Sequence, residues 1–506
     1  MATTPAGAQR QRPHLVFFPF PAQGHVTPAF QLAKLLHHRH GFDVTFVHTE
    51  HNRRRLLRTR GPDALAGSPG FRFAAVPDGL PPSDEDAAQD MAALHRSLET
   101  TVPHFKQLVS GLPAPATSCC LVSDVEHILR AAEEISMPRV TFWITSASSF
   151  MAFQQCQQLV AKGLVPLKVE HADAEQLRNE YLDSTVVDWV PGLPKAMRLR
   201  DFPSFIRTTD PDDAALAMTL RSMECHRTVP SAVIFHTFEE LEGNVISAMS
   251  TILPPIYAVG PLPPLLRQVG GDGDPAAVDT TLGSSNLSKE NRACLDWLAG
   301  KRPNSVVFAS FGSLVSLTSE QLVELAWGLA NSGHEFLLVI RNDQRRRQVK
   351  GGDADDATAG LLPPELLAAA AKGRGLVTSW CPQEAVLRHE AVGAFLTHCG
   401  WNSMLESLCA GVPMLCWPFA GDQQPNGRLA CTEWRVGVEI GEGAGREEVE
   451  MAVRQVMGGE RGEELRKSAM DWKEKVDAAT LPAGYAWANL ERVVNEVLTP
   501  LMQKNY

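Results

Sequence analysis

The sequence lacks long apolar runs, paired-cysteine motifs and an excess of positive charge. No stretch approaches the roughly 20 apolar residues of a membrane-spanning helix. The ten cysteines form no C-x-x-C pair and no metal-binding spacing, so we expect buried, reduced thiols. The net charge of −11 argues against a nucleic-acid-binding protein. We therefore expect a cytoplasmic protein with no membrane span and no nucleic-acid partner.

The composition is that of a globular protein with more than one domain. Of 506 residues, 44% are hydrophobic and 21% are charged, which is ordinary for a globular protein. At roughly 100–200 residues per domain, this length suggests two or three domains. The first strand-like run should be followed by a helix with Thr27 as its cap and Pro28 in its first turn. Strand-like and helix-like runs then alternate, which predicts a parallel, doubly wound α/β sheet. The strand-like runs of this half are Leu15–Phe20, Asp43–His48, Phe71–Val76, Cys119–Ser123 and Val140–Trp143.

The second half repeats this alternation after a stretch rich in Pro, Gly and Asp that has little periodicity. Its strand-like runs are Ser305–Phe311, Glu335–Ile340, Leu376–Ser379, Ala394–Thr397 and Pro413–Cys416. We predict a Rossmann-like domain over residues 1–255, a linker over 256–289 and a second Rossmann-like domain over 290–482. A C-terminal helix over 483–506 should pack back on the first domain. Two facing domains of this kind bind ligands at the carboxyl ends of their strands.

Small and polar residues follow the strands of the second half. His398 and Gly400 come after one strand, and Asn402 with Ser403 opens the next helix. Free backbone N–H groups and a positive dipole end make such a helix start an anion site. Gly312 and Ser313 follow another strand and could donate to the same anion. No GxxxxGK[ST] or GxGxxG motif occurs there, which disfavours an NTPase or a dinucleotide-binding protein.

A purely structural interpretation of these residues is also available. Ser403 and Glu406 have the S-x-x-E spacing of a capping box, and Asp422 could be only a turn residue.

The stretch from Trp380 to Gln423 reads WCPQEAVLRHEAVGAFLTHCGWNSMLESLCAGVPMLCWPFAGDQ. It resembles the secondary-product glycosyltransferase box of plant family-1 UDP-glycosyltransferases, and the likeness extends from His14 to about Leu498. Within that family the chain is most similar to the subgroup that glucosylates cyanohydrins and terpenoid alcohols. The resemblance implies a GT-B architecture, with an acceptor-binding first domain and a UDP-sugar-binding second domain. It also implies inverting transfer of glucose from UDP-glucose to a hydroxyl of a small apolar metabolite, giving a β-glucoside.

The resemblance implies roles for individual residues. His25 matches the general base and Asp124 its acidic partner, although Glu126 is a nearby alternative acid. The sugar would be bound by Trp401, Asp422, Gln423 and Thr145, and Ile144 stands where many relatives have a Thr that touches the sugar. The residues implied for UDP are Ser313, Trp380, Cys381, Gln383, His398, Gly400, Asn402, Ser403 and Glu406. The composition of the nearby N-terminal loops suggests an apolar acceptor pocket with Phe150, Met151, Phe153 and Phe205.

Three alternatives compete with this assignment. A metal-dependent transferase would use a D-x-D motif, and Asp210–Asp212, Asp272–Asp274 and Asp353–Asp355 match by spelling. These lie in Pro- and Gly-rich loops, where Asp favours turns. A non-catalytic nucleotide-sugar-binding protein would lack the base, and a phosphorylase would need a lysine that is absent from the Trp380–Gln423 stretch. We therefore expect UDP-glucose as co-substrate, no metal or other cofactor, and a monomer.

Overall fold

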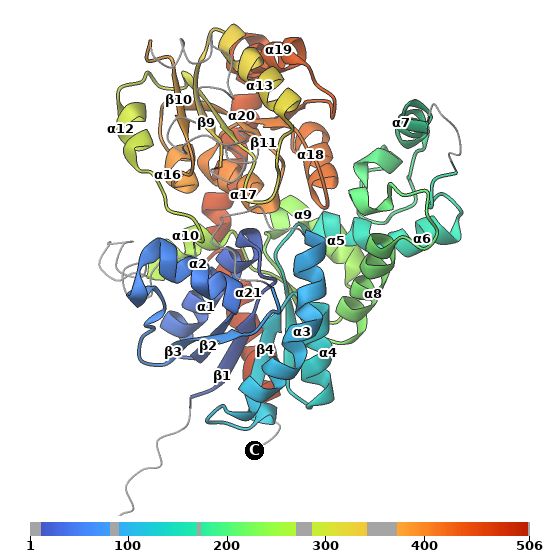
Figure 1. Cartoon of the computed structure of the whole chain (residues 1–506), viewed down its shortest axis with the longest axis vertical. Coiled ribbons are helices and arrows are strands. Elements are labelled where there is room, and N and C mark those ends of the chain that lie inside the picture. The colour runs from blue at the N-terminus through green and yellow to red at the C-terminus, as the bar shows by residue number, and fades with distance from the viewer. Residues whose placement is uncertain (1–11, 81–90, 169–173, 270–285, 342–371, 504–506) are drawn as a thin grey trace, which may run out of the picture.

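The computed structural model describes residues 12–80, 91–168, 174–269, 286–341 and 372–503, which form two α/β domains stacked end to end (Figure 1). The N-terminal sheet has the strand order β3-β2-β1-β4-β5-β6-β7, and the C-terminal sheet has the order β10-β9-β8-β11-β12-β13. Neighbouring strands are parallel throughout both sheets. This confirms the predicted pair of facing Rossmann-like domains.

The N-terminal sheet is built from runs of apolar residues that are buried on both faces, as parallel strands require. In β1, for example, every residue from Leu15 to Phe18 is at most 1% exposed. The strands are β1 (His14–Phe18), β2 (Asp43–Thr49), β3 (Phe71–Val76), β4 (Cys119–Ser123), β5 (Arg139–Trp143), β6 (Val233–Phe235) and β7 (Ile256–Ala258). The helices are α1 (Gln23–His40), α2 (Glu50–Arg60), α3 (Met91–Ser110), α4 (Glu126–Glu134), α5 (Ala147–Gln154), α6 (Cys156–Ala161), α7 (Ala174–Ser184), α8 (Ala214–Thr228), α9 (Glu239–Met249) and α10 (Leu262–Val269).

The first helix begins earlier than predicted. Helix α1 starts at Gln23 after Ala22, so Pro28 lies inside the helix and Thr27 is not its cap. His25 consequently lies in the first turn of α1 and not in a loop before it.

The C-terminal sheet comprises β8 (Val306–Ser310), β9 (Glu335–Val339), β10 (Gly375–Thr378), β11 (Val392–Thr397), β12 (Met414–Cys416) and β13 (Gly437–Glu439). Its helices are α12 (Ala293–Ala299), α13 (Ser319–Asn331), α16 (Gln383–Leu387), α17 (Trp401–Ala410), α18 (Gln423–Thr432), α19 (Arg446–Met457) and α20 (Gly459–Thr480). Thr318 caps α13 and forms a capping box with Gln321.

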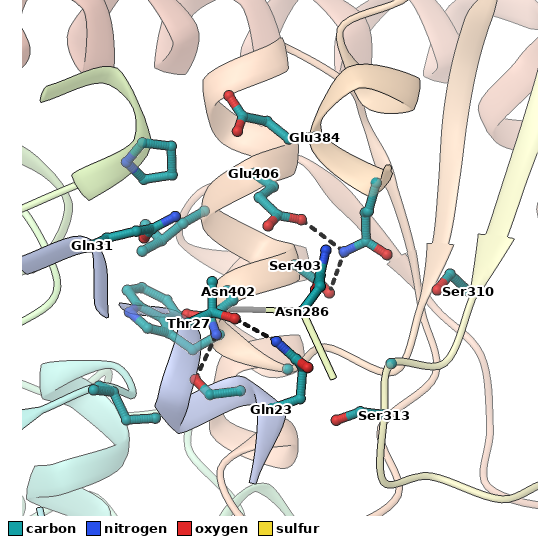
Figure 2. A pocket seen from close by; sticks show the side chains of 18 of the residues that line it. Gln23, Thr27, Gln31, Asn286, Ser310, Ser313, Glu384, Asn402, Ser403 and Glu406 are labelled. Atoms are coloured by element: carbon teal, nitrogen blue, oxygen red, sulfur yellow. Dashed lines mark hydrogen bonds between the residues drawn. The ribbon is translucent and has the colours of Figure 1, made fainter. Parts of the chain in front are cut away.

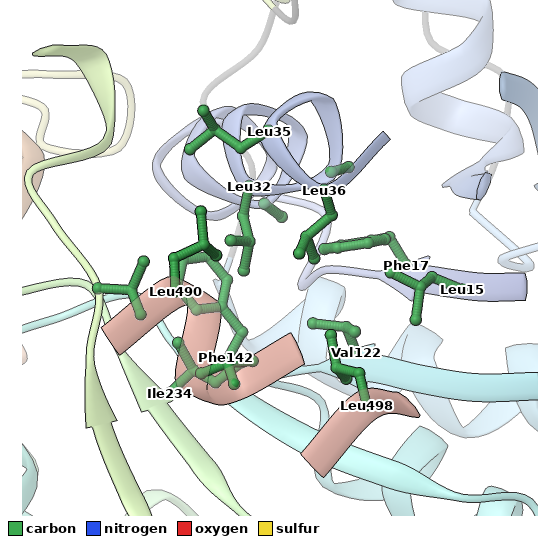
Figure 3. Close-up of a cluster of buried hydrophobic side chains, with 14 of the residues drawn as sticks. Leu15, Phe17, Leu32, Leu35, Leu36, Val122, Phe142, Ile234, Leu490 and Leu498 are labelled. Atoms are coloured by element: carbon green, nitrogen blue, oxygen red, sulfur yellow. The ribbon is translucent and has the colours of Figure 1, made fainter. Parts of the chain in front are cut away.

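The last helical segments belong to the core of the N-terminal domain. They are α21 (Tyr485–Arg492), the π-helical turn η6 (Val493–Leu498) and α22 (Thr499–Gln503). Leu490 and Leu498 pack with Leu15 and Phe17 beneath α1 (Figure 3). Burial of such side chains contributes about 1.5–3 kcal/mol each.

The expected linker is partly regular structure. Ile256–Ala258 forms the edge strand β7, and Leu262–Val269 forms α10, whose Leu262 and Leu265 are fully buried against the N-terminal core. The expectation of irregular chain from residue 256 was therefore wrong for 256–269. Residues 270–285 of the predicted linker lie outside the described residues.

Candidate functional site

A cavity of about 480 Å³ lies between the two domains, where the carboxyl ends of β5, β8 and β11 open. Figure 2 shows Asn402, Ser403 and Glu406 on α17 facing Gln23 and Thr27 on α1. The cavity lining includes His25 and every residue assigned to UDP or sugar from the sequence. The parallel-sheet rule that predicted a crevice at the strand ends therefore holds for this chain.

His25 and Asp124 form a close pair at the N-terminal side of this cavity. His25 Nδ1 lies 2.5 Å from Asp124 Oδ2, and the backbone N–H of Phe20 donates to Asp124 Oδ1 at 2.8 Å. The Asp124 side chain is 5% exposed, whereas that of His25 is 26% exposed. A carboxylate at Nδ1 favours the proton on that nitrogen, which leaves Nε2 to act as a base.

The structure shows which of the two candidate acids, Asp124 or Glu126, contacts His25. Glu126, the first residue of α4, lies with its carboxylate 3.6 Å from Arg130 and 3.8 Å from Arg221. Asp124 is therefore the carboxylate that contacts His25.

A second polar group lies on the C-terminal side. Gln383 Nε2 donates to Ser403 Oγ at 2.9 Å and to Glu406 Oε2 at 2.7 Å. Burial raises the pKa of Glu406 to about 7, against the lowering effect of the Gln383 hydrogen bond. Helix α17 has Gly400 as its N-cap and no side-chain cap. The capping-box interpretation of Ser403 and Glu406 is therefore wrong, and both side chains line the cavity.

His398 is confined between two glycines. A Cβ atom on Gly312 would lie 2.6 Å from His398 Cε1, and one on Gly400 would lie 2.4 Å from His398 Nε2. Burial, reinforced by the Arg341 charge, lowers the pKa of His398 to about 4, so the ring is neutral near pH 7. It lies beside the start of α17, where the backbone N–H groups of the first turn point to the cavity end of the helix.

Arg341, which follows β9, was missed by sequence reasoning. Its side chain is 8% exposed and donates from Nη1 to the carbonyl oxygens of Gly312 (3.0 Å) and Val315 (2.6 Å). Nη2 donates to Ser316 Oγ at 3.1 Å. Arg341 thus fixes the loop after β8 that carries Ser313. The available signal was a cation directly after a buried strand.

The residues assigned to the sugar come from both domains. Asp422 is the N-cap residue of α18, and burial raises its pKa to about 6, against the lowering effects of Asn426 and His25. Gln423 Oε1 accepts from the backbone N–H groups of Phe419 (2.9 Å) and Ala420 (3.0 Å), so its NH₂ group is the part able to donate to a ligand. Thr145 Oγ1 lies 2.9 Å from Ser149 Oγ at the start of α5.

Two of the tryptophans in the motif, Trp401 and Trp380, lie in different surroundings. Trp401 is 3% exposed, and its Nε1 donates to the carbonyl oxygen of His236 at 2.7 Å. Its ring therefore contacts the N-terminal domain. Trp380 and Cys381 line the cavity ahead of α16, and the Trp380 carbonyl accepts from Asn291 N at 2.9 Å.

The four residues predicted for an acceptor pocket are outside the lining of this cavity. Phe150 and Met151 are at most 1% exposed, and Phe153 is 8% exposed, all within the core beneath α5. Phe150 packs edge-on against Trp143, with ring centroids 4.7 Å apart. The cavity lining includes none of these three nor Phe205, as far as the chain is described. These residues were chosen because they are apolar. Apolar residues occur both on a helix face that packs against the sheet and on one that contacts a ligand, so composition does not distinguish the two.

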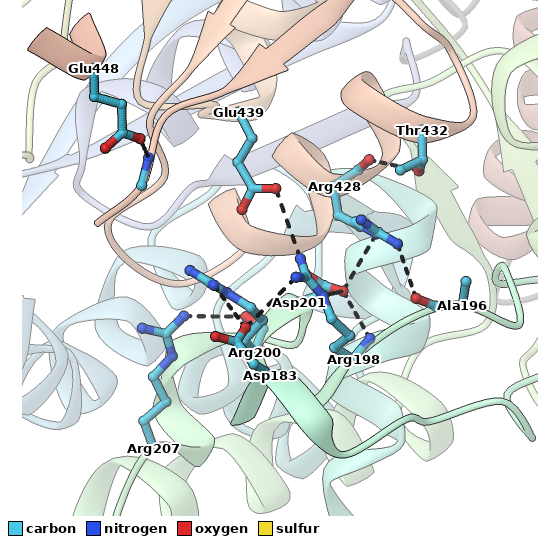
Figure 4. Close-up of polar contacts among 11 residues, drawn as sticks. Asp183, Ala196, Arg198, Arg200, Asp201, Arg207, Arg428, Thr432, Glu439 and Glu448 are labelled. Carbon is cyan, nitrogen blue, oxygen red and sulfur yellow. Dashed lines mark hydrogen bonds and ion pairs between the residues drawn. The ribbon is translucent and has the colours of Figure 1, made fainter. Parts of the chain in front are cut away.

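Ion pairs tie α18 to the N-terminal domain (Figure 4). The buried carboxylate of Asp201 accepts from Arg198 Nη2 at 2.8 Å and lies 3.5 Å from Arg428 Nε on α18. Arg428 Nη2 also donates to the carbonyl oxygen of Ala196 at 3.1 Å. The helix that carries Asp422 and Gln423 is thereby held against residues 196–201.

The D-x-D stretches, the cysteines and the helices are the remaining candidates for metal, disulfide or membrane features. Asp210 accepts from the Asp212 backbone N–H at 2.9 Å, which is a turn, while the other two D-x-D stretches lie outside the described residues. Within the described ranges, no group of three or more His, Cys, Asp or Glu side chains could hold a metal ion. All ten cysteines are unpaired thiols, and eight are buried. None of the helices in the described part of the chain is long and apolar enough to cross a membrane.

Comparison with known proteins identifies the family. The family model for UDP-glucoronosyl and UDP-glucosyl transferase matches residues 284–472. The chain is 48% identical to a 7-deoxyloganetin glucosyltransferase of Gardenia jasminoides and 46% identical to an (R)-mandelonitrile beta-glucosyltransferase of Prunus dulcis, in each case over 97% of this chain and 98% of the relative. Its fold matches that of Os79 from O. sativa in complex with UDP, with a TM-score of 0.75 and 26% identity over 96% of this chain and 100% of the other. The resemblance inferred from the Trp380–Gln423 motif is confirmed, and the chain belongs to the plant UDP-glycosyltransferases of GT-B fold.

Proposed function

We propose that the protein transfers glucose from UDP-glucose to a hydroxyl group of a small apolar metabolite, with inversion to the β-glucoside. The observation that carries this proposal is the His25–Asp124 pair, at 2.5 Å, in the same cavity as the residues assigned to the UDP-sugar. A base at this place is what a transferase needs and a passive nucleotide-sugar-binding protein does not.

The proposed mechanism is a single displacement. His25 Nε2 takes the proton of the acceptor hydroxyl as its oxygen attacks the anomeric carbon from the face opposite UDP. Asp124 stabilises the resulting imidazolium without itself taking the proton. Negative charge develops on the departing diphosphate, where the first turn of α17 and a donor nitrogen of neutral His398 stabilise it.

The donor residues divide by the part of UDP-glucose that they contact. Trp380 offers a ring face to uracil, and the Cys381 backbone faces the base edge. Glu406, oriented by Gln383, accepts from the two ribose hydroxyls. Asp422 accepts from glucose hydroxyls while the Gln423 NH₂ group donates to them.

The acceptor class follows from the relatives and from the cavity. The two relatives act, by name, on 7-deoxyloganetin and on (R)-mandelonitrile. Ile144, Leu314 and Leu266 give the cavity apolar lining. We therefore propose a terpenoid alcohol or cyanohydrin as acceptor, handled in the cytoplasm, where ten unpaired thiols stay reduced.

The proposal is tested by incubating the protein with UDP-glucose and a panel of such alcohols, with and without EDTA. The products are analysed by mass spectrometry. We expect a mass gain of one hexose on at least one alcohol, and cleavage of the product by a β-glucosidase. Because the proposed stabilisation of the diphosphate uses protein groups alone, EDTA should not abolish transfer. Strict dependence on added Mg²⁺ or Mn²⁺, or no transfer to any alcohol, would contradict the proposal.

A further inference from the structure

Asn426 is a fully buried amide one turn after Asp422 on α18, with 0% exposure. Its Oδ1 accepts from Ser146 Oγ at 2.6 Å, across the domain boundary. Its Nδ2 donates to Asp422 Oδ2 at 2.9 Å and to the carbonyl oxygen of Cys399 at 3.1 Å. Both hydrogens of the amide and its carbonyl oxygen are therefore used, which is the condition for a buried amide to be stable.

The orientation of this amide follows from its neighbours. The Asp422 carboxylate and the Cys399 carbonyl can only accept hydrogen bonds, so the NH₂ group must face them. Ser146 Oγ already accepts from the Ser149 backbone N–H at 2.9 Å, so its own hydrogen is available for Asn426 Oδ1. Hydrogen bonds thus run in one direction, from Ser146 through Asn426 to Asp422.

Ser146 is itself fixed by the N-terminal domain. It is the N-cap of α5 and is 0% exposed. The adjoining backbone N–H groups of Ala147 and Ser148 donate to the buried Glu242 carboxylate at 2.9 and 2.8 Å. The start of α5 is a rigid support because three of its N–H groups are satisfied by side chains.

The Cys399 contact adds a second function. Cys399 has φ of +65°, in the left-handed region that residues other than glycine rarely adopt, and lies between His398 and Gly400. Asn426 donates to the carbonyl of this residue, so one amide supports both the turn beside His398 and the carboxylate of Asp422.

We propose that Asn426 is a positioning residue for donor-sugar selection. It holds the Asp422 carboxylate in a fixed position relative to the His398–Gly400 turn, and it is itself oriented by Ser146. The proposal rests on the proposed function, because it assumes that Asp422 reads sugar hydroxyls. Asn426 engages Oδ2 and so fixes the orientation of the carboxylate of Asp422, a residue that lines the cavity. The N-terminal domain would then contribute to donor selection through a residue that does not touch the sugar.

The charge of Asp422 depends on the same contact. The titratable group that faces Asp422 is His25 of α1, whose own partner is Asp124 after β4. Burial raises the pKa of Asp422, while the Asn426 hydrogen bond and His25 lower it. Loss of the Asn426 amide should therefore raise the pKa of Asp422 and reduce the ionised fraction near pH 6.

The test compares Asn426→Ala and Ser146→Ala with the control Asn489→Ala. Asn489 is also a buried amide, 5% exposed, which donates to Glu239 Oε1 at 3.1 Å and to the Ala258 carbonyl at 3.0 Å, on α21 of the N-terminal core. Discrimination is measured as the ratio of Kd for UDP-glucose and UDP-galactose by calorimetry, which needs no acceptor. It is measured again as the ratio of kcat/KM with an accepted alcohol, across pH 5–8.

We expect Asn426→Ala to lose discrimination between the two sugars by about tenfold, the scale of one hydrogen bond to a charged group. Affinity for UDP should stay within about twofold in Ser146→Ala, because that variant keeps the hydrogen bond from Asn426 to the Cys399 carbonyl. Ser146→Ala should show a smaller loss of discrimination between the two sugars. If Asn426→Ala fails to fold, Ser146→Ala alone tests the proposal. The acidic limb of kcat/KM for UDP-glucose should move to higher pH in Asn426→Ala but not in Asn489→Ala.

The inference is overturned if the folded variants keep the wild-type ratio of affinities and the wild-type pH limb, or if Asn489→Ala changes both equally. An inactive wild-type protein would contradict the proposed function, whereas the affinity ratios would still decide the role of Asn426.

Discussion

Asn402 donates from Nδ2 to the backbone carbonyl oxygen of Gly24 at 2.7 Å and thereby joins the first turn of α17 to the first turn of α1. The Gly24 carbonyl is available because Pro28, four residues later in the helix, has no N–H to donate to it. A proline inside α1 thus leaves an acceptor beside His25, and a side chain from the nucleotide-binding domain occupies it.

This contact predicts that Pro28 and Asn402 act together. In Asn402→Ala, kcat/KM should fall by about tenfold or more, because a partly buried carbonyl beside the base loses its hydrogen-bond donor. Pro28→Ala supplies an intrahelical N–H to Gly24, so the effect of Asn402→Ala should be smaller in that background. A double-mutant cycle on kcat/KM measures the coupling, and strict additivity of the two changes would show that the contact has no role.

Gly400→Ala should weaken UDP-glucose binding. The backbone at Gly400 (φ −63°, ψ 139°) is open to alanine, but the new Cβ would lie 2.4 Å from His398 Nε2. Relief of such overpacking costs about 1–3 kcal/mol, which corresponds to a loss of affinity of roughly 5- to 150-fold by calorimetry. Gly443→Ala is the matched control, since its Cβ would meet nothing within 4 Å. Equal affinities in both variants would show that the His398 position is unimportant.

The raised pKa of Glu406 predicts a pH dependence of donor binding. With a pKa of about 7, this carboxyl is neutral at lower pH, and it accepts hydrogen bonds from the two ribose hydroxyls more strongly when it is ionised. Affinity for UDP-glucose should therefore rise as pH increases from 6 to 8, and it should fall as pH drops through 7. Titration calorimetry across this range should show the slope in the wild-type protein and its loss in Glu406→Gln. The same slope in both proteins would assign the titration to another group.

Asp422→Ala should reduce transfer from UDP-glucose while UDP affinity stays nearly unchanged. A site that hydrogen-bonds a hydroxyl penalises its inversion, at about 1–3 kcal/mol for each polar group left unpaired. The wild-type protein should therefore prefer UDP-glucose over UDP-galactose by at least about tenfold in kcat/KM. Because Ile144 offers no hydrogen bond to the sugar, UDP-xylose should be a secondary donor. Equal use of the glucose and galactose donors by the wild-type protein would contradict this assignment.

The sequence was most informative where strands are long and buried. The runs at Asp43–His48, Phe71–Val76 and Cys119–Ser123 match β2, β3 and β4 to within one residue. The strands β6, β7 and β13 were missed and have three residues each, whereas β12, equally short, was predicted as Pro413–Cys416. Three residues are too few to show periodicity, so such strands are predicted unreliably. The start of α1 was misplaced because Pro28 was taken as a first-turn proline, whereas tertiary contact at Gly24 lets it sit inside the helix.

For the site, the motif placed Gln383, Ser403 and Glu406 correctly around one cavity, because their spacing on α16 and α17 is local. Contacts across the domain boundary, such as Asn402–Gly24 and Asn426–Ser146, leave no local pattern in either partner. Phe150, Met151 and Phe153, predicted for the acceptor, are buried in the core instead of lining this cavity, because apolar composition does not distinguish a core position from a ligand contact.

The most direct test of the catalytic assignment is the rate of sugar transfer by His25→Ala under conditions where chemistry limits turnover. Removal of the base leaves the groups around Gln383 and Glu406 in place, so calorimetry should show UDP affinity close to that of the wild-type protein. General-base catalysis contributes roughly 10²–10⁴-fold, and we predict a loss of transfer of that size. Retention of more than about a tenth of the wild-type rate would contradict the assignment of His25 as the base.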